Sequence, residues 1–313
     1  MSEGTLMVKA DYISAASLLE PWEQSIASGE GPVVYRHSFP VPEISPGSIV
    51  LVGGAPGSGK TALIMNVVVE MLRFTPSLKV LVVNVEMSPN ALLDRQLARL
   101  SGIDGQTIRH RRFTKEHDER LGAGIATIRS FSDRIAFLRP PFDLNNVAVS
   151  ADEFGADVIV LDYIQRIRSA QGDGEARAGM NRVMDDLRKF TSAGVAVIVL
   201  SAVGRSKDNK GRTSYAGADL SLGSFRESSE LEFGADDAFI LAPASSKGGN
   251  LMRLSHLKCR HGAIQSLDLD FDRAHQSFTI PGKGAENPVG TELADLFNAT
   301  EAAADDDARG AVK

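Results

Sequence analysis

Residues 54–61 have the composition and spacing of a phosphate-binding loop. Gly54, Gly59, Lys60 and Thr61 occupy every fixed position of the pattern G-x-x-x-x-G-K-[ST]. Glycines allow successive backbone N–H groups to turn inward around a phosphate, and the helix after the loop points its positive end at the same group. Lys60 is then expected to reach the β- and γ-phosphates, and Thr61 to hold Mg²⁺. The residues expected to contact ATP through this loop are Gly54, Ala55, Pro56, Gly57, Ser58, Gly59, Lys60, Thr61 and Ala62.

The alternative is a glycine-rich turn that binds nothing, and the flanking segments argue against it. Residues 49–52 are apolar and partly β-branched, as in a buried strand. Apolar residues then recur at helical spacing from Leu63 to Leu72. The sequence therefore predicts the strand, loop and helix that a phosphate-binding loop requires.

Two carboxylates follow buried strands. Asp162 comes after the apolar run 158–161, at the C-terminal end of a strand, where open α/β sheets bind ligands. This place suits a carboxylate that helps to hold Mg²⁺, and it also suits an acid that only caps the next helix. Glu86 follows the strand at 79–85. It could orient and deprotonate the water that attacks the γ-phosphate, or serve as an acid before the next helix.

A late strand over 254–261 carries cations at alternate positions. Alternation predicts His256, Lys258 and Arg260 on one face and Cys259, as a small core residue, on the other. Lys258 and Arg260 are then either a solvated edge or catalytic cations that a neighbouring subunit inserts to neutralise transition-state charge.

The elements that must position these residues follow an α/β order, with helical patterns between buried strands, and this order is typical of a parallel sheet. The predicted parallel strands cover 49–52, 79–85, 134–138, 157–161 and 195–200. A more antiparallel edge is predicted over 237–241, 251–258, 266–271 and 277–280.

Three parts of the chain are expected. Residues 1–45 form an N-terminal arm and lead-in, 46–282 the core, and 283–313 an acidic, disordered tail. In the arm, Pro21 is expected to interrupt a helix over 11–28.

The amino-acid composition limits the kinds of protein that this chain can be. Of 313 residues, 43% are hydrophobic and 24% charged, as in a globular protein with a large core. Without a long apolar run or a signal-peptide layout, we expect a cytoplasmic protein with no membrane partner. The single cysteine excludes an internal disulfide, and the histidines lack zinc-binding spacing. A net charge of −6 argues against a protein that coats nucleic acid over its whole surface, but leaves room for a local basic channel.

Several ordered motifs between residues 46 and 280 resemble the motor domain of the DnaB-type replicative helicases. Besides the loop at 54–61 they are Val85-Glu86-Met87-Ser88, Arg95, Ile159-Val160-Leu161-Asp162-Tyr163-Ile164-Gln165, Phe225-Arg226-Glu227-Ser228 with Phe233-Gly234-Ala235-Asp236-Asp237, and Lys258-x-Arg260-x-Gly262. The resemblance implies a RecA-like P-loop NTPase core, with a central, mostly parallel sheet flanked by helices and antiparallel C-terminal edge strands.

The resemblance also implies roles. Glu86 would be the catalytic base, Asp162 the Mg²⁺ partner and Arg95 a nucleotide-site arginine, while Lys258 and Arg260 would act on the adjacent subunit's nucleotide. It implies a hexameric homo-oligomer with ATP between subunits and single-stranded DNA in the channel. Loops at about 166–178 and 204–222 would line that channel. Their DNA-binding candidates are Arg166, Arg168, Lys207, Lys210 and Arg212, for which solvated charge stays the alternative.

The sequence departs from the family in two places. Leu200-Ser201-Ala202 stands where the family has Leu-Ser-Gln, so the glutamine that links the γ-phosphate to the DNA loop is absent. Because residues 1–45 are all that precede the core, we also expect the family's N-terminal helical domain to be absent. We therefore expect a motor of a plasmid, phage or mobile element rather than a chromosomal helicase.

The leading expectation is an ATP-hydrolysing hexameric motor that translocates on or unwinds DNA. The alternative is a nucleotide-gated ring ATPase that assembles with or regulates a protein partner without unwinding, which Ala202 and the acidic charge favour. The N-terminal arm or the acidic tail could hold such a partner. A recombinase filament fits the string at 162–165 poorly.

Overall fold

The chain divides into two compact units. The computed structural model describes residues 12–29, 31–169, 176–204, 206–207, 213–214, 221–225, 229–245 and 249–282. The first unit ends at Val34 and the second begins at Tyr35. The acidic tail expected over 283–313 lies outside the described residues.

The first unit contains helix α1, Ala15–Ser28. The Ser14 side chain accepts the N–H of Ser17 at its start, and Gly29 ends it in a left-handed conformation. The prediction that Pro21 interrupts this helix is wrong, because α1 runs through it. A proline removes one N–H donor but leaves the bonds of the neighbouring turns in place, so a helix capped at both ends can continue past it.

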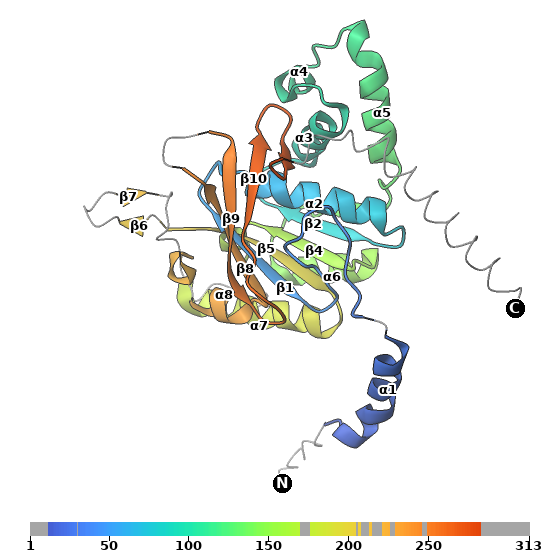
Figure 1. Ribbon diagram of the computed structural model, residues 1–313, viewed down its shortest axis with the longest axis vertical. Helices are drawn as coiled ribbons and strands as arrows, with labels where there is room; N and C mark the ends of the chain where they lie inside the picture. The colour runs from blue at the N-terminus through green and yellow to red at the C-terminus, as the bar shows by residue number, and fades with distance from the viewer. Residues whose placement is uncertain are drawn as a thin grey trace, which may run out of the picture. The chain divides into compact units, whose positions relative to one another are not determined.

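The second unit is built on a sheet that, among the described residues, has nine strands in the order β11-β10-β9-β8-β1-β5-β4-β2-β3 (Figure 1). The strands from β8 to β3 in this order are parallel, and β9, β10 and β11 continue the sheet antiparallel. The predicted mostly parallel sheet with antiparallel C-terminal edge strands is confirmed. The strands are β1 Ile49–Gly54, β2 Val80–Asn84, β3 Ile135–Phe137, β4 Val158–Asp162, β5 Ala196–Ala202, β8 Asp237–Pro243, β9 Leu251–Cys259, β10 Leu267–Asp272 and β11 Ser277–Thr279.

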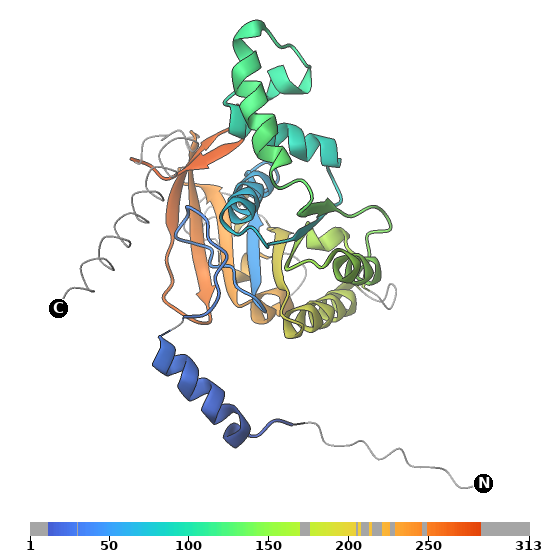
Figure 2. The same ribbon diagram turned by 90° about the vertical axis from the view of Figure 1, so that its right-hand side faces the viewer.

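Alternate residues of the central strands face two separate hydrophobic cores. In β1, Val50 and Val52 belong to the first core, and Ile49 and Leu51 to the second. Helix α2 (Lys60–Phe74) packs into the first core. The helices α6 (Leu144–Phe154), α7 (Ala176–Ser192) and α8 (Ser229–Gly234) pack into the second, so helices lie on both sides of the sheet (Figure 2). Burial on both faces explains why these strands are almost continuously apolar.

The unit that contains the sheet begins at Tyr35, earlier than the expected core boundary at residue 46. The lead-in packs its apolar side chains Tyr35, Phe39, Val41 and Ile44 into the first core. Its backbone is also held, because the Glu70 carboxylate accepts the N–H and the hydroxyl of Ser38 at 2.8 and 2.7 Å. The prolines of this segment predict an extended lead-in, but its apolar residues pack into the core, so the segment belongs to the second unit.

Three helices lie between β2 and β3 and have a small core of their own. They are α3 (Pro89–Ser101), α4 (Gly105–Arg109) and α5 (Asp118–Arg129). Ala98, Ile103 and Ile108 form their buried contact. The short helices α4 and α8 were not predicted, because one or two turns give too few residues for a helical period to show. Among the described helices, none combines the length and apolar character needed to cross a membrane.

Candidate functional site

The phosphate-binding motif forms a loop between β1 and α2. Gly57 and Gly59 have positive φ angles of 75° and 94°, which glycine adopts without steric cost. The Lys60 ammonium group donates hydrogen bonds to the carbonyl oxygens of Gly54 and Ala55, at 2.8 and 3.0 Å. Burial lowers the pKa of Lys60, while the nearby Asp162 and Glu86 carboxylates act in the opposite direction. The loop thus holds the partly desolvated Lys60 ammonium group against its own carbonyl groups.

Asp162 lies against the first turn of α2. Its Oδ2 accepts hydrogen bonds from the Thr61 hydroxyl at 2.7 Å and from the Asn84 amide at 2.6 Å. Burial raises the pKa of Asp162, and the Thr61 hydroxyl, Lys60 and Arg95 oppose that shift. The two residues expected to hold Mg²⁺ are therefore in direct contact.

Glu86 follows β2, whose neighbour in the sheet is β4, so Glu86 and Asp162 stand at the same edge. Its side chain is exposed and makes no hydrogen bond or ion pair with any described residue. Glu86 lines the cavity beside the phosphate loop together with Lys60, Thr61 and Asp162. It is placed to meet a ligand rather than to satisfy the protein's own polar groups.

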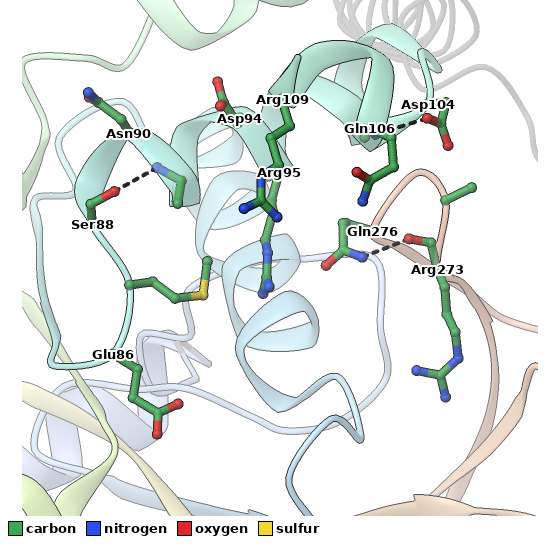
Figure 3. A pocket seen from close by; sticks show the side chains of 14 residues that line it. Glu86, Ser88, Asn90, Asp94, Arg95, Asp104, Gln106, Arg109, Arg273 and Gln276 are labelled. Atoms are coloured by element: carbon green, nitrogen blue, oxygen red, sulfur yellow. Dashed lines mark hydrogen bonds between the residues drawn. The ribbon is translucent and has the colours of Figure 1, made fainter.

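The cavity beside the loop has a volume of about 500 Å³. Besides the residues just described, Arg95, Ala202 and the β10–β11 turn line it. A second cavity of about 550 Å³ adjoins it and shares Glu86, Arg95, Arg273 and Gln276 with it. Figure 3 shows Arg95 and Arg109 projecting into this second cavity from the helices, with Glu86 and Arg273 at its borders. Together the cavities form a cleft that continues from the loop to α3 and α4 and is lined by both basic and acidic side chains.

The β10–β11 hairpin covers the phosphate loop, and the sequence did not predict this. A Cβ atom on Gly59 would stand 2.8 Å from the Phe271 ring, which stacks on Phe278 with ring centroids 4.2 Å apart. The Arg273 guanidinium lies over the Phe271 ring and donates a hydrogen bond to the Gly57 carbonyl at 3.2 Å. A pairing between segments so distant in the chain leaves no local pattern in either of them.

Lys258 and Arg260 lie far from the loop of their own chain. The N–H of Arg260 donates to the Asp236 carbonyl at 3.0 Å, and the N–H of Asp236 donates to the Ile49 carbonyl at 2.8 Å. Ile49 begins β1, whereas the phosphate loop follows the end of β1. The length of the strand separates Arg260 from that loop by on the order of 15 Å, which is beyond the reach of one side chain.

The predicted alternation along β9 is wrong at one residue. The register between β8 and β9 shifts between Ala238 and Phe239, which face Lys258 and His256, so Leu257 is an extra residue. His256 and Cys259 therefore share a face, where their ligand-type atoms and those of Asp237 lie within 4.8 Å of one another. His256 Nδ1 accepts the N–H of Gln265, so its Nε2 carries the proton and donates to Asp237 at 3.0 Å. The hydrogen bond between His256 and Asp237 thus connects the side chains of β9 and β8.

Of the five DNA-binding candidates, Arg166 and Arg168 are exposed next to the end of β4. The Arg166 guanidinium donates to the Tyr163 hydroxyl at 3.0 Å. Lys207 lies in the short strand β6 (Ser206–Lys207), which pairs with β7 (Thr213–Ser214), and its side chain is not described. Lys210 and Arg212 lie outside the described residues.

Comparison with known proteins gives a consistent family. A model of the DnaB-like helicase C-terminal domain matches residues 43–280. The chain is 25% identical over 241 residues to the "Probable plasmid replicative DNA helicase" of Chlamydia trachomatis serovar L2, which aligns 75% of this chain with 51% of that protein. It is 28% identical over 204 residues to the "Replicative DNA helicase DnaB" of Pasteurella multocida, covering 62% and 42%. The chain spans about half the length of the curated relatives it matches.

Two solved structures have the same fold. The ATPase domain of G40P superposes with a TM-score of 0.73 at 21% identity, covering 86% of this chain and 99% of that domain. A DnaB-like replicative helicase, studied for its interactions with primase, superposes with a TM-score of 0.72 at 22% identity, covering 86% and 67%.

Proposed function

The chain belongs to the family of DnaB-like helicase C-terminal domains, and we propose that it is an ATP-hydrolysing motor that acts on single-stranded DNA as a hexameric ring. One observation carries this proposal. Lys60, Thr61, Glu86 and Asp162 line one cavity beside the phosphate loop. The two cations on β9 lie near the opposite end of β1, where Lys258 donates to the Phe233 carbonyl and Arg260 to the Asp236 carboxylate.

The residues present fit a nucleotide with Mg²⁺. Thr61 and Asp162 offer a hydroxyl and a carboxylate oxygen 2.7 Å apart, and hard oxygen donors are the ligands that Mg²⁺ prefers. Beyond Gly57 and its chain neighbours, nothing lies within 4 Å of the place where a Cβ of Gly57 would stand, which leaves space beside the loop backbone for a phosphate. When bound, Mg²⁺ neutralises charge that develops on the phosphate oxygens.

The protein's own groups divide the remaining work. Lys60 can exchange its two carbonyl partners for phosphate oxygens without leaving the loop. Asp162 keeps Thr61 oriented through their hydrogen bond. The exposed Glu86 carboxylate can accept the proton of a water beside the terminal phosphate. Arg95, half-buried at the border of both cavities, supplies a further positive charge to the phosphate end.

Completion of this site requires a second subunit. Arg260 cannot reach the phosphate loop of its own chain across the length of β1. A head-to-tail contact that repeats and closes makes a ring and brings Lys258 and Arg260 of each subunit to the next subunit's loop. The exposed cations Arg166 and Arg168 suit contacts to a DNA backbone, and the named plasmid relatives support a role in a plasmid, phage or mobile element.

A ring ATPase that acts on a protein partner without unwinding is the second candidate, and one observation favours it. Ala202 lines the nucleotide cavity with a methyl group where the family has a glutamine. Gln165 instead contacts this strand end, donating to the Ser201 hydroxyl at 2.8 Å. A partner could bind through the N-terminal arm or the tail.

The test is ATP hydrolysis by the purified chain with and without single-stranded DNA at low salt. We expect hydrolysis that DNA stimulates, and a Glu86→Gln variant with kcat lowered about 10²-fold or more at unchanged ATP binding. Hydrolysis that DNA neither stimulates nor inhibits, together with no DNA binding, would favour the second candidate. No hydrolysis by a chain that forms a ring would contradict both.

A further inference from the structure

Asn84 is a buried amide that connects the two carboxylates of the candidate site. It is the last residue of β2 and lies directly opposite Asp162, the last residue of β4. The residue is buried, with 8% of its surface exposed. The Nδ2 group donates to Asp162 Oδ2 at 2.6 Å, while Oδ1 accepts the N–H groups of Glu86 and Met87 at 3.1 and 2.7 Å.

The hydrogen-bond partners determine the orientation of this amide. Two backbone N–H groups face one end, so that end must be the oxygen, and a carboxylate faces the other, so that end must be the nitrogen. Among uncharged side chains of this size, only asparagine carries its donor and its acceptor on separate atoms, so that one end donates to the carboxylate while the other accepts two N–H groups. The structure therefore assigns a specific chemical reason for asparagine at this position.

The Glu86 carboxylate has no described hydrogen-bond or ion-pair partner, so its position depends on its backbone. Asn84 holds that backbone through two N–H groups, and the N–H of Val85 adds a bond to the Asp162 carbonyl at 3.0 Å. The same amide holds Asp162 in contact with Thr61. One side chain thus relates the position of Glu86 to that of the Thr61–Asp162 pair.

We propose that Asn84 is a positioning residue for nucleotide hydrolysis, which sets Glu86 relative to the Thr61–Asp162 pair. This role rests on the proposed function. Asn84 lies behind both carboxylates and touches neither water nor phosphate in the reaction; it acts through the residues it holds.

Two variants separate the two ends of the amide. Asn84→Ala removes every contact. Asn84→Asp has the same shape and keeps the acceptor for the N–H groups of Glu86 and Met87, but it places a second carboxylate against Asp162. The first variant releases both partners, and the second disturbs Asp162 alone.

Amide hydrogen exchange of the ligand-free protein tests whether Asn84 holds the backbone at Glu86, and it does not require ATP hydrolysis. We expect the N–H groups of 86–87 to exchange at least about tenfold faster in Asn84→Ala and at the wild-type rate in Asn84→Asp, because only the former loses the acceptor. A peptide from β5 serves as the control, since general destabilisation would accelerate exchange there too. Unchanged exchange at 86–87 in Asn84→Ala would overturn the proposal.

Hydrolysis supplies the second measurement. We expect both variants to lose at least about tenfold in kcat, with the KM for ATP within about threefold of wild type, because misplacement of catalytic groups lowers the rate more than it weakens binding. If the wild type hydrolyses ATP and Asn84→Ala stays within about twofold of it, the positioning role fails while the proposed function stands. A wild type that hydrolyses no ATP overturns the proposed function, and this role with it.

Discussion

At the scale of single residues, the buried Asp162 carboxylate lowers the stability of the ligand-free fold but suits the binding of a cation. Its Oδ2 accepts two hydrogen bonds, yet burial still raises its pKa above the ordinary value of 3.8. An ionised carboxylate whose native pKa is raised costs folding free energy wherever it is charged in both states. A cation bound beside it would remove that cost, which is the expected trade between stability and function at a binding site.

We therefore predict that Asp162→Asn raises the Tm of the ligand-free protein at neutral pH. The asparagine oxygen can accept both existing bonds, and the buried charge is lost. The cost of Asp162 is present above its raised native pKa and disappears as the pH falls through that pKa toward 3.8, so the difference in Tm should shrink over the same range. Thermal unfolding of both proteins from pH 8 to pH 4 measures it. A lower Tm for the variant at pH 7 would contradict this account.

At the scale of elements, Asp236 connects β1, which leads into the phosphate loop, to β9, which carries Lys258 and Arg260, the cations proposed to act on a neighbouring subunit. One carboxylate oxygen accepts the N–H of Ile49 at 2.8 Å in a buried position, and the other accepts the Arg260 guanidinium at 2.5 Å. The first bond satisfies a backbone donor at the start of β1. The second positions a half-exposed side chain that is expected to serve another subunit.

These two bonds should differ in their contribution to stability. We predict that Asp236→Ala lowers the free energy of unfolding by about 1–3 kcal/mol, because the buried N–H of Ile49 loses its acceptor. Asp236→Asn keeps an oxygen for that N–H and should cost less than about half as much, since an ion pair to an exposed Arg260 contributes little. Urea unfolding of both variants is the measurement. Equal losses would show that the contact with Arg260, rather than the β1 donor, dominates.

At the scale of the whole molecule, the proposed site draws its residues from two chains. Lys60, Thr61, Glu86 and Asp162 line the cavity, whereas Arg260 lies beside the opposite end of β1. A second copy related head to tail would supply the missing cations. The positions of these side chains at opposite ends of β1 support the proposed oligomer.

Mixing two inactive variants tests this arrangement. Glu86→Gln and Arg260→Ala should each abolish most hydrolysis when alone. In a mixed ring, an Arg260→Ala subunit with its intact Glu86 can meet the intact Arg260 of a Glu86→Gln neighbour. With random equal mixing and independent sites, about a quarter of the sites become complete, so about a quarter of the wild-type rate should return. A rate equal to the average of the two separate variants would contradict a shared site.

The sequence was sufficient for the features that depend on local pattern. The phosphate loop is a contiguous motif, and strand and helix periods on either side of it extend over few residues. Asp162 and Glu86 could be placed at one edge because parallel strands end on the same side of a sheet, and β2 and β4 do so. Asn84 was visible in the sequence only as a polar residue at the end of an apolar strand. That pattern is the same for a site residue as for an ordinary end of a strand.

Only the tertiary structure decided the rest, because those features depend on pairing between distant segments. The hairpin of Phe271 and Arg273 covers the loop at Gly59 through contacts that neither segment's sequence contains. An extra residue at Leu257 places His256 on the face of Cys259 instead of the predicted face of Lys258 and Arg260, since a bulge depends on the partner strand and not on the alternation within its own strand. The sequence by itself determined which groups could bind a nucleotide. The fold decided that Asn84 connects Glu86 to Asp162 and that Arg260 lies far from its own loop, because the order and register of the strands set those distances.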